Sequence, residues 1–258
     1  MSFQELGAEQ YSTHDRDLEQ RVQETILSNT AVMERTEHLV SLVPNGIETL
    51  LDVGAGYGVF LDQLQKARSI QSEGVDISED RIAWGLKRGH KLQLASAHQL
   101  PYPDLSFDCL VSSEVLEHLH WGIYEETLPE FARVAREWIL ISVPYDERRN
   151  FARCPYCGAS ANPNNHFRSF APADFEGLFP GFELQMVDTV GELSVITMLK
   201  PYLPTAWHSE LICPSCHYRC RTQAARQKDQ RMSTLKRIIR AAPLPRRPRW
   251  LVGLYRRV

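Results

Sequence analysis

The spacing of apolar residues changes repeatedly between two periods along the first two thirds of the chain. Short apolar runs predict buried strands at Thr49–Val53, Gln71–Val75, Lys91–Ala95, Phe107–Ser112 and Trp138–Val143. Apolar residues at three- and four-residue spacing predict helices at residues 8–43, Val59–Ala67, Glu79–Lys87, Leu116–Leu119 and Tyr124–Glu137. Because strands and helices alternate, we expect an α/β fold in which a parallel sheet has helices on both faces.

The last third of the chain has a different pattern. Two apolar runs, Phe182–Val190 and Glu192–Leu199, flank Gly191, which is typical of an antiparallel hairpin. Residues 241–258 are rich in Pro and Arg and show no core of their own. We therefore predict four parts: a helical segment (1–46), a main α/β domain (47–200) with an insertion (150–168), a short segment (201–227) and a basic amphipathic tail (228–258).

Composition and charge limit the location and partners of the protein. The 258 residues, 43% of them apolar, suit one domain of about 200 residues with an appendage. Because the sequence has neither a bilayer-spanning apolar run nor a signal-peptide pattern at its start, we expect a cytoplasmic protein. Residues 219–258 carry 13 Lys and Arg and one acid, whereas the first 218 residues carry 16 bases and 31 acids. This asymmetry predicts an anionic partner for the tail, or docking of the tail on its own acidic body.

Four of the six cysteines form two C-P-x-C pairs, Cys154 with Cys157 and Cys213 with Cys216. Two thiolates at this spacing chelate one ion, and the amides of the intervening turn point at sulfur. In a reducing compartment the spacing favours metal over a disulfide, with a redox-active pair as the alternative. We therefore predict one structural zinc ion that joins the insertion to the C-terminal segment. Four cysteines leave no open position on the ion, so we assign it no chemistry.

A glycine-rich loop, Leu51–Gly58, follows the first predicted strand and precedes a helix. Its glycines, in the order G-x-G-x-G, allow positive φ angles and close approach of a ligand. The spacing differs from the dinucleotide fingerprint, and the Gly-Lys of a phosphate loop is absent. Asp76 ends the second predicted strand, where its carboxylate can accept hydrogen bonds from both hydroxyls of a ribose. The sequence therefore predicts a nucleoside-containing cofactor at the carboxyl edge of the sheet.

With these motifs the chain resembles the class I S-adenosylmethionine-dependent methyltransferases, in particular the small-molecule and ubiquinone-type groups (methyltransferase type 11/12-like). The resemblance also rests on residues 99–108 (QLPYPDLSFD), 113–119 (SEVLEHL) and 141–144 (ISVP). It implies a Rossmann-like sheet of seven strands with helices on both faces, to which residues 182–199 contribute the closing strands. It also implies S-adenosylmethionine (SAM) as the cofactor and methyl transfer as the reaction.

The resemblance implies that residues at the ends of the strands contact the cofactor. The expected contacts are Asp52, Gly54, Gly56 and Gly58 near the methionine part, Asp76 on the ribose, Ile77 on the adenine, Ser96, Ala97 and His98 along the adenine edge, and Ser113 and Glu114 beside the sulfonium. Ser96 stands where the family commonly has an acid, so we expect its hydroxyl to accept the hydrogen bond from the adenine amino group.

Methyl transfer to a hydroxyl requires a positioned acceptor and removal of its proton. Glu114 and His118 lie four residues apart on the short helix predicted there, so we expect them to share one face. His166 follows the fifth strand, at the side of the sheet where acceptors bind. We expect all three around the transferable methyl group, with His166 as the base or acceptor-positioning residue and His118 as support. Packing of His118 and a capping role for His166 are the alternatives. We expect Arg168 to bind an anionic group of the substrate.

The basic tail admits three interpretations. Leu235, Ile238 and Ile239 lie on one helical face, and a second amphipathic stretch contains Trp250, Leu251, Leu254 and Tyr255. Apolar faces among cations suit the anionic inner face of a membrane, to which the protein would then bind peripherally. Nucleic acid and the acidic body of the protein are the other two partners.

Three functions compete at this stage. The first is O-methylation of a small molecule, a sugar or a lipid-linked glycan. The second is an RNA methyltransferase that holds nucleic acid with its zinc site and tail. It is less favoured, because residues 112–115 lack the motif that holds a flipped base for methylation of an exocyclic amine. The third is a SAM-binding protein without turnover.

Overall fold

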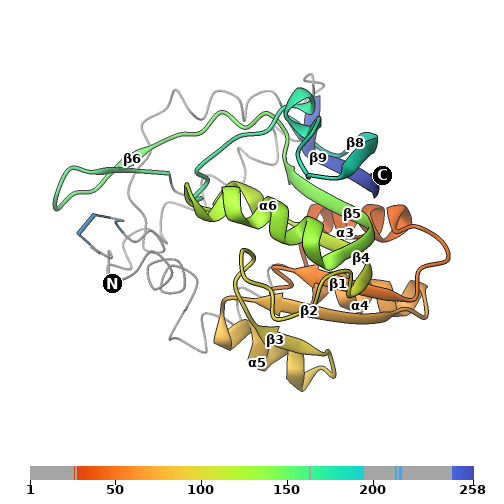
Figure 1. Cartoon of the computed structure of the whole chain (residues 1–258). Coiled ribbons are helices and arrows are strands. Elements are labelled where there is room, and N and C mark those ends of the chain that lie inside the picture. The colour runs from red at the N-terminus through yellow and green to blue at the C-terminus, as the bar shows by residue number, and fades with distance from the viewer. Residues whose placement is uncertain (1–25, 27, 163, 195–212, 214, 217–245) are drawn as a thin grey trace.

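The computed structural model describes residues 26, 28–162, 164–194, 213, 215–216 and 246–258 (Figure 1). The predicted helix over residues 8–25, the end of the predicted hairpin at residues 195–199 and the helical part of the tail lie outside the described residues. The described chain contains one large sheet, helices on both of its faces and a separate two-stranded ribbon.

The large sheet has seven strands in the order β3-β2-β1-β4-β5-β9-β8. Their bounds are β1 Thr49–Val53, β2 Gln71–Asp76, β3 Leu92–Leu94, β4 Phe107–Ser113, β5 Ala135–Pro144, β8 Phe182–Ser194 and β9 Arg246–Arg257. The pairings among β1 to β5 are all parallel, whereas β9 pairs antiparallel with β5 on one side and β8 on the other. The predicted Rossmann-like fold is confirmed, with β1 at the centre of its parallel part.

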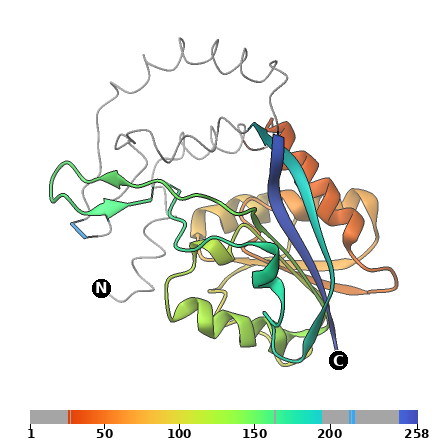
Figure 2. The same ribbon diagram turned by 90° about the horizontal axis from the view of Figure 1, so that it is seen from above.

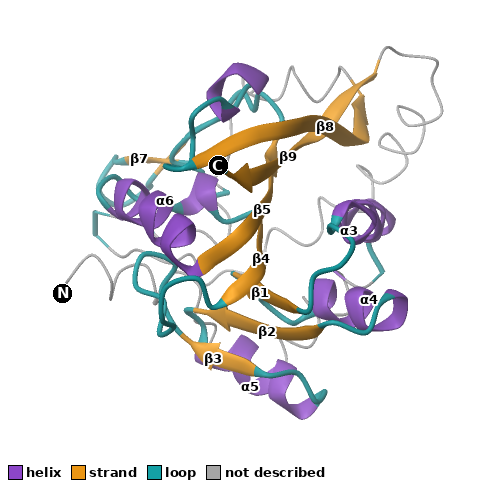
Figure 3. Ribbon diagram, turned by 45° about the vertical axis from the view of Figure 1, so that its right-hand side comes forward, coloured by secondary structure: helices purple, strands orange, loops and turns teal. Residues whose placement is uncertain are grey.

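The helices cover both faces of this sheet (Figure 3). Helices α3 (Thr30–Leu42), α4 (Val59–Ala67) and α5 (Glu79–Lys87) place Leu39, Leu61 and Ile82 in one apolar core. Helix α6 (Ile123–Val134) places Phe131 in the core on the other face. Because helices cover both faces, most residues of β1 and β4 are buried, and neither strand alternates between apolar and polar residues.

Local chemistry explains where the two helices nearest the glycine loop begin. Gly58 precedes α4 with φ +76°, a left-handed conformation that glycine adopts without a Cβ penalty. Ser78 precedes α5, and its hydroxyl accepts a hydrogen bond from the amide of Arg81. Two acids, Glu79 and Asp80, follow in the first turn, where their negative charges interact favourably with the positive end of the helix dipole. Both helices therefore start at the carboxyl edge of the sheet.

The predicted hairpin around Gly191 is wrong. Strand β8 runs through Gly191 without turning and pairs with β9, which lies beside it (Figure 2). Gly191 has φ +67°, and a Cβ there would lie 2.8 Å from an atom of the Trp250 ring. The glycine therefore gives room to an aromatic side chain of the neighbouring strand and does not form a turn.

The end of the predicted basic tail forms strand β9, inside the sheet. Trp250, Leu251, Val252 and Tyr255 are buried, so the second amphipathic stretch is a core strand. Arginines at its ends pair with acids of the body. Arg246 lies 2.8 Å from Glu192, and Arg256 lies 2.9 Å from Glu137. These pairs are contacts of the kind expected for docking on the acidic body. The apolar pattern did not predict a strand here, because residues 246–257 pair with β5 and β8, which lie more than 50 positions away in the chain.

Helix α6 ends three residues before the predicted boundary, because Ala135–Glu137 begin β5. Ala135 pairs with Phe107 across the sheet, and the guanidinium of Arg257 donates a hydrogen bond to its carbonyl oxygen (2.6 Å). Pairing with β4 and the hydrogen bond from Arg257 thus place Ala135–Glu137 in a strand, although their sequence pattern predicts a helix.

The chain after β5 leaves the sheet and forms a small ribbon of β6 (Ala152–Arg153) and β7 (Ser160–Ala161), which projects from the body (Figure 2). It returns to the carboxyl edge of the sheet, where the amide of Asp146 donates to the carbonyl oxygen of Phe170 (2.8 Å). The short helix η2 (Pro172–Phe175) then leads to β8. None of the described helices combines the length and the apolar character that crossing a bilayer requires.

Candidate active site

The glycine loop occupies the turn between β1 and α4, as predicted. Gly54, Gly56 and Gly58 have φ angles of +80°, +54° and +76°. The amide of Gly54 donates to the carbonyl oxygen of Val75 in β2 (2.8 Å). A Cβ on Gly54 would lie 2.2 Å from a methyl carbon of Val115, so no larger residue fits there. The loop is thus held flat against the strand ends, with its backbone close to any ligand bound at this edge.

Two carboxylates stand beside this loop. Asp76 ends β2, and its carboxylate accepts hydrogen bonds from the amides of Gly56 (2.8 Å) and Ser78 (2.9 Å). Asp52 in β1 is only 2% exposed. Burial, together with the nearby charge of Asp76, raises the pKa of Asp52 to about 8. Ile77 follows directly in the chain and is half-buried.

The segment after β3 contains Ser96, Ala97 and His98, of which Ala97 is buried. The hydroxyl of Ser96 lies 2.7 Å from Nδ1 of His98. Sequence reasoning gave this hydroxyl a partner in the ligand, whereas in the described structure it has one within the segment. Ser113 ends β4, at the same edge of the sheet as the glycine loop.

Glu114 follows β4 in an unusual conformation. Its φ is +57°, in the left-handed region that side chains other than glycine rarely adopt. Its carboxylate accepts a hydrogen bond from Nε1 of Trp250 (2.9 Å) and pairs with Arg35 (3.1 Å). The predicted shared helical face of Glu114 and His118 is wrong, because the helical turn η1 (Leu116–His118) begins only after Glu114. Strained backbone of this kind concentrates at functional sites.

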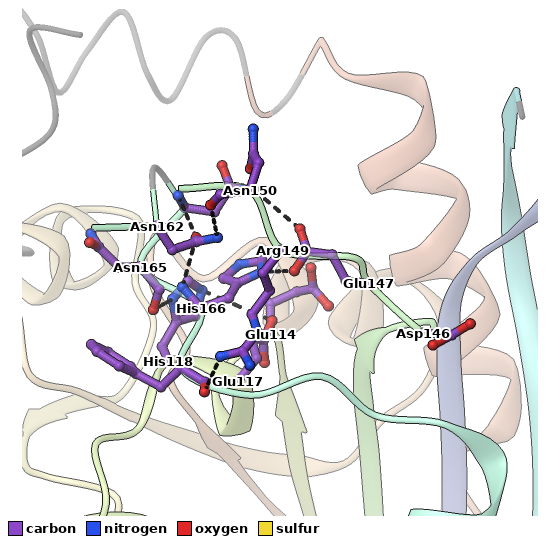
Figure 4. Close-up of polar contacts among 12 residues, drawn as sticks. Glu114, Glu117, His118, Asp146, Glu147, Arg149, Asn150, Asn162, Asn165 and His166 are labelled. Atoms are coloured by element: carbon purple, nitrogen blue, oxygen red, sulfur yellow. Dashed lines mark hydrogen bonds and ion pairs between the residues drawn. The ribbon is translucent and has the colours of Figure 1, made fainter. Parts of the chain in front are cut away.

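His118 and His166 lie together, as predicted, although 48 residues separate them in the chain (Figure 4). Their ring centroids are 4.6 Å apart, with the rings edge to face. Nδ1 of His166 pairs with the carboxylate of Glu147, and Nδ1 of His118 lies 3.3 Å from the carbonyl oxygen of Asn165. The acid that orients an imidazole here is therefore Glu147, and not Glu114.

Glu117 completes this group of side chains. It is fully buried, and its Oε1 lies 4.0 Å from Nε2 of His118. Burial and the charge of Glu114 raise the pKa of Glu117 well above its usual range. Burial also lowers the pKa of His118 to about 3, so that its imidazole is neutral at physiological pH. Burial opposes ionisation of Glu147, but the hydrogen bond with His166 keeps its pKa below the usual value.

A network of loop contacts fixes the position of His166. The side chain of Asn162 accepts hydrogen bonds from the amides of Asn164 (2.8 Å) and His166 (3.1 Å) and donates to the carbonyl oxygen of Asn150 (2.9 Å). The amide of Phe167 donates to the carbonyl oxygen of Glu117 (2.7 Å), which ties the loop to η1. These contacts fix the loop that contains His166 against η1, which contains His118.

The expectation that Arg168 binds substrate is not supported by its surroundings. Its side chain is buried, donates to the carbonyl oxygens of Leu116 (3.0 Å) and Leu119, and lies over the rings of Trp121 and Tyr124. The guanidinium therefore holds the η1 segment in place.

The four cysteines of the two C-P-x-C pairs form one cluster, with all four sulfur atoms within 4.8 Å of one another. The distance between the sulfurs of Cys154 and Cys216 is 3.7 Å, and that between Cys157 and Cys213 is 3.6 Å. A tetrahedral site with zinc–sulfur bonds of about 2.3 Å has edges of about 3.8 Å. A disulfide bond would bring two sulfurs to about 2.05 Å. The cluster thus has the dimensions of a four-cysteine metal site.

Backbone amides surround the first of these pairs. Gly158 has φ +76° and donates its amide to the carbonyl oxygen of Cys154 (2.9 Å), which closes the turn. Burial works against a thiolate here, but hydrogen bonds from the amides of Cys157 and Tyr156 bring the pKa of Cys154 down to about 7. This is the arrangement of turn amides around sulfur that the C-P-x-C spacing predicts.

Sequence reasoning missed Glu117 and Glu147. Glu117 adjoins His118 in the chain, but adjacent residues of a regular helix do not face each other, and burial of an acid is uncommon. Glu147 lies in a run of charged residues (146–149), a pattern that is typical of an exposed loop. Its proximity to His166 arises only because the chain returns from the ribbon to the sheet edge.

Comparison with known proteins connects this geometry to a family. The profile of a methyltransferase domain matches residues 51–138. The chain is 30% identical over 117 residues to 27-O-demethylrifamycin SV methyltransferase of Amycolatopsis mediterranei, and 33% identical over 94 residues to ajmaline N-methyltransferase of Rauvolfia serpentina. These alignments cover 41% and 33% of this chain and 42% and 32% of the relatives. The chain thus spans less than half the length of these curated relatives.

Solved structures share the fold over a greater length. A SAM-dependent methyltransferase from Archaeoglobus fulgidus superposes with a TM-score of 0.58 at 18% identity, covering 94% of this chain and 100% of that one. A SAM-dependent methyltransferase from Thermotoga maritima gives 0.56 at 17% identity, covering 94% and 97%. At these identities the likeness concerns the fold.

Proposed function

We propose that the chain is a class I S-adenosylmethionine-dependent methyltransferase, as the methyltransferase profile over residues 51–138 supports, and that it methylates a hydroxyl group of a small molecule, a sugar or a lipid-linked glycan. The observation that carries the proposal is the placement of two groups at one sheet edge. The glycine loop with Asp76 follows β1 and β2, and the His118–His166 pair follows β4 and β5. A relative named for methylation of rifamycin at an oxygen position supports a small-molecule acceptor.

The residues at the loop fit SAM. A carboxylate has about four acceptor positions, and Asp76 uses two of them for the amides of Gly56 and Ser78. Two therefore remain for the ribose hydroxyls. The three glycines leave room for the methionine part, and Ile77 with Ser96, Ala97 and His98 would line the adenine. SAM supplies an electrophilic methyl group on a positively charged sulfur, which Asp52, Ser113 and Glu114 would face.

The histidine pair fits the acceptor. A hydroxyl group is barely ionised at neutral pH, so a base must take its proton as the new bond to carbon forms. Nδ1 of His166 donates its proton to Glu147, which leaves the lone pair of the ring on Nε2. In the simplest mechanism, Nε2 of His166 accepts the hydroxyl proton, His118 supports the loop, and Glu114 closes the cofactor side.

The cysteine cluster fits a structural zinc ion, which would join the ribbon of residues 150–168 to Cys213 and Cys216.

Membrane contact through the tail rests only on the basic residues outside the described part of the chain, because β9 pairs with β5 and β8 within the sheet.

Replacement of Asp76 by Ala tests the cofactor assignment. We expect SAM to raise the melting temperature of the unaltered protein, and the variant to bind SAM about 10- to 100-fold more weakly, because hydrogen bonds to a charged group are lost. Calorimetric titration measures the affinity, and NAD serves as the ligand control. Glu79→Ala removes an exposed acid three residues away and should bind SAM normally. Asp76→Asn shows whether the carboxylate itself, or only its bond to the loop, matters; unchanged affinity in both Asp76 variants would refute the assignment.

Labelled SAM identifies the acceptor class. Incubation with a fractionated lysate should place the label in a small-molecule, glycan or lipid fraction. Label in RNA would instead favour the nucleic-acid function, and SAM binding without label in any fraction would favour a protein without turnover.

Once the acceptor is known, His166→Ala should lower the rate about 100-fold or more with nearly unchanged affinity for SAM. His120→Gln is the matched control, because the His120 ring packs against Phe167 and is not part of the His118–His166 pair. Steady-state kinetics with both variants measures the effect. A parallel loss of SAM affinity in His166→Ala would make the residue structural, and full activity would remove it from the mechanism.

A further inference from the structure

A second group of metal-ligating side chains lies apart from the four cysteines. Glu117, His118 and His166 each direct one ligand atom to a common region, and these atoms all lie within 4.8 Å of one another (Figure 4). The group contains two nitrogens and a carboxylate, and no sulfur. Its chemistry therefore differs from that of the cysteine cluster.

The carboxylate of Glu117 lacks the partners that a buried acid normally has. The side chain is 1% exposed, and neither oxygen accepts a hydrogen bond within the described part of the chain. Leaving such a group without a partner is unfavourable, and more so when it is charged. A positive ion among these side chains would satisfy both oxygens at once.

Both imidazoles are held in the orientation that metal ligands require. A carbonyl oxygen can only accept, so Nδ1 of His118 carries the proton that it shares with Asn165, and the lone pair is on Nε2. Nδ1 of His166 likewise donates to the carboxylate of Glu147. Histidines that bind metals typically donate the other ring nitrogen to a carboxylate or a backbone carbonyl, which fixes the tautomer. Here His118 donates to the backbone carbonyl of Asn165, and His166 donates to the carboxylate of Glu147.

We infer that Glu117, His118 and His166 bind a divalent cation, with Glu147 and the backbone of Asn165 as the groups that orient the two histidines. Two imidazoles and one carboxylate favour Mn²⁺, Fe²⁺, Co²⁺ or Zn²⁺ over Ca²⁺. Metal–ligand bonds of about 2.1 Å imply ligand separations of about 3.0–3.4 Å, so binding draws the three side chains slightly closer. Glu114 and Glu147 add negative charge around the site.

This site has open positions, unlike the cysteine cluster. Three protein ligands leave at least one coordination position for water or for an oxygen of the acceptor. The consequence for catalysis rests on the proposed function: a hydroxyl bound to the cation has a lowered pKa, so its proton passes to water. The oxygen then forms its bond to the methyl carbon as the carbon–sulfur bond of SAM breaks, and the neutral thioether leaves with the electron pair. His166 is then a ligand that positions the cation, and not the base.

A neutral, buried Glu117 that binds nothing is the competing interpretation. In that case Glu117→Gln preserves the shape of the side chain and should change neither metal content nor the activity. The two interpretations therefore differ in the response of this one variant.

The experiment uses the full chain with its cysteine cluster already loaded with zinc. Mn²⁺ binding is followed by the electron paramagnetic resonance signal of the free ion, and total zinc by metal analysis after dialysis against Zn²⁺. We expect one additional cation per chain. Glu117→Gln and His166→Ala should weaken its binding by at least 100-fold, Glu147→Gln by 10- to 100-fold, and His120→Gln should leave it unchanged.

Two further readouts separate the possible failures. SAM affinity should be the same in Glu117→Gln and in the unaltered protein, which shows that the variant folds and that the cofactor assignment stands independently. No additional cation of either kind, or equal binding by Glu117→Gln, would overturn the inferred site while leaving the methyltransferase proposal intact. If the cation acts on the acceptor, a chelator that spares the cysteine zinc should abolish turnover without affecting SAM binding.

Discussion

Replacement of Cys213 by Ser is expected to release the metal from the cysteine cluster and to unfold the ribbon of residues 150–168. The sulfur separations of 3.6 and 3.7 Å match a tetrahedral metal site, and a hydroxyl is a far weaker zinc ligand than a thiolate. Metal binding of this kind contributes on the order of 10 kcal/mol to the folding of small zinc domains, so this is the largest local effect that we expect.

Metal analysis and hydrogen exchange measure the two parts of this prediction. The unaltered protein, purified without chelator, should hold zinc in the cluster, and Cys213→Ser should lose it. Amides of β6 and β7 should exchange faster in the variant, whereas those of β1 and β4 should stay protected, because the ribbon lies outside the main sheet. Cys109→Ala is the control: Cys109 is buried in β4, away from the cluster, and its replacement should leave the metal in place. A disulfide found by mass spectrometry would contradict the assignment.

Replacement of Trp250 by Ala is expected to destabilise the whole protein by about 3–5 kcal/mol. The ring is 3% exposed and packs against Gly191, with the guanidinium groups of Arg35 and Arg249 at 4.7 and 4.1 Å from its centre. Its removal leaves a cavity between β9, β8 and α3. The side chain also donates its N–H to Glu114, so the cofactor edge loses a support at the same time.

Urea unfolding of two variants separates packing from hydrogen bonding. Trp250→Phe keeps an aromatic ring in the space beside Gly191 and removes the N–H, so we expect a loss of about 1–3 kcal/mol. The difference between the two variants then reports the packing of the ring. A loss below about 1 kcal/mol in Trp250→Ala would mean that β9 does not occupy the interior of the sheet.

The local pattern of the sequence was sufficient for the parallel half of the fold. Strand β1 and helix α4 have the predicted bounds, because an apolar run covered on both faces and an amphipathic stretch of nine residues are each distinctive without their neighbours. The glycine loop, Asp76 and the two C-P-x-C pairs were equally visible, because in each case the chemistry depends on residues a few positions apart. The pairing of His118 with His166 followed from topology, since parallel strands end at the same edge.

The rest was decided by contacts between distant parts of the chain. The charge of residues 246–258 indicated a tail, but the burial of Trp250, Leu251 and Tyr255 against β5 and β8 outweighs it and makes them a strand. A glycine between two apolar runs is typical of a turn. In the structure, Gly191 lies within β8, because a side chain at this position would collide with the ring of Trp250. Glu117 and Glu147 acquire their roles only when the ribbon returns to the sheet edge, because burial and proximity are properties of the folded chain. The sequence was thus sufficient to predict the parallel strands, the glycine loop, the two histidines and the four cysteines, because each of these depends on local pattern or on the order of the strands. The tertiary structure decided which acids face the histidines and which strand closes the sheet.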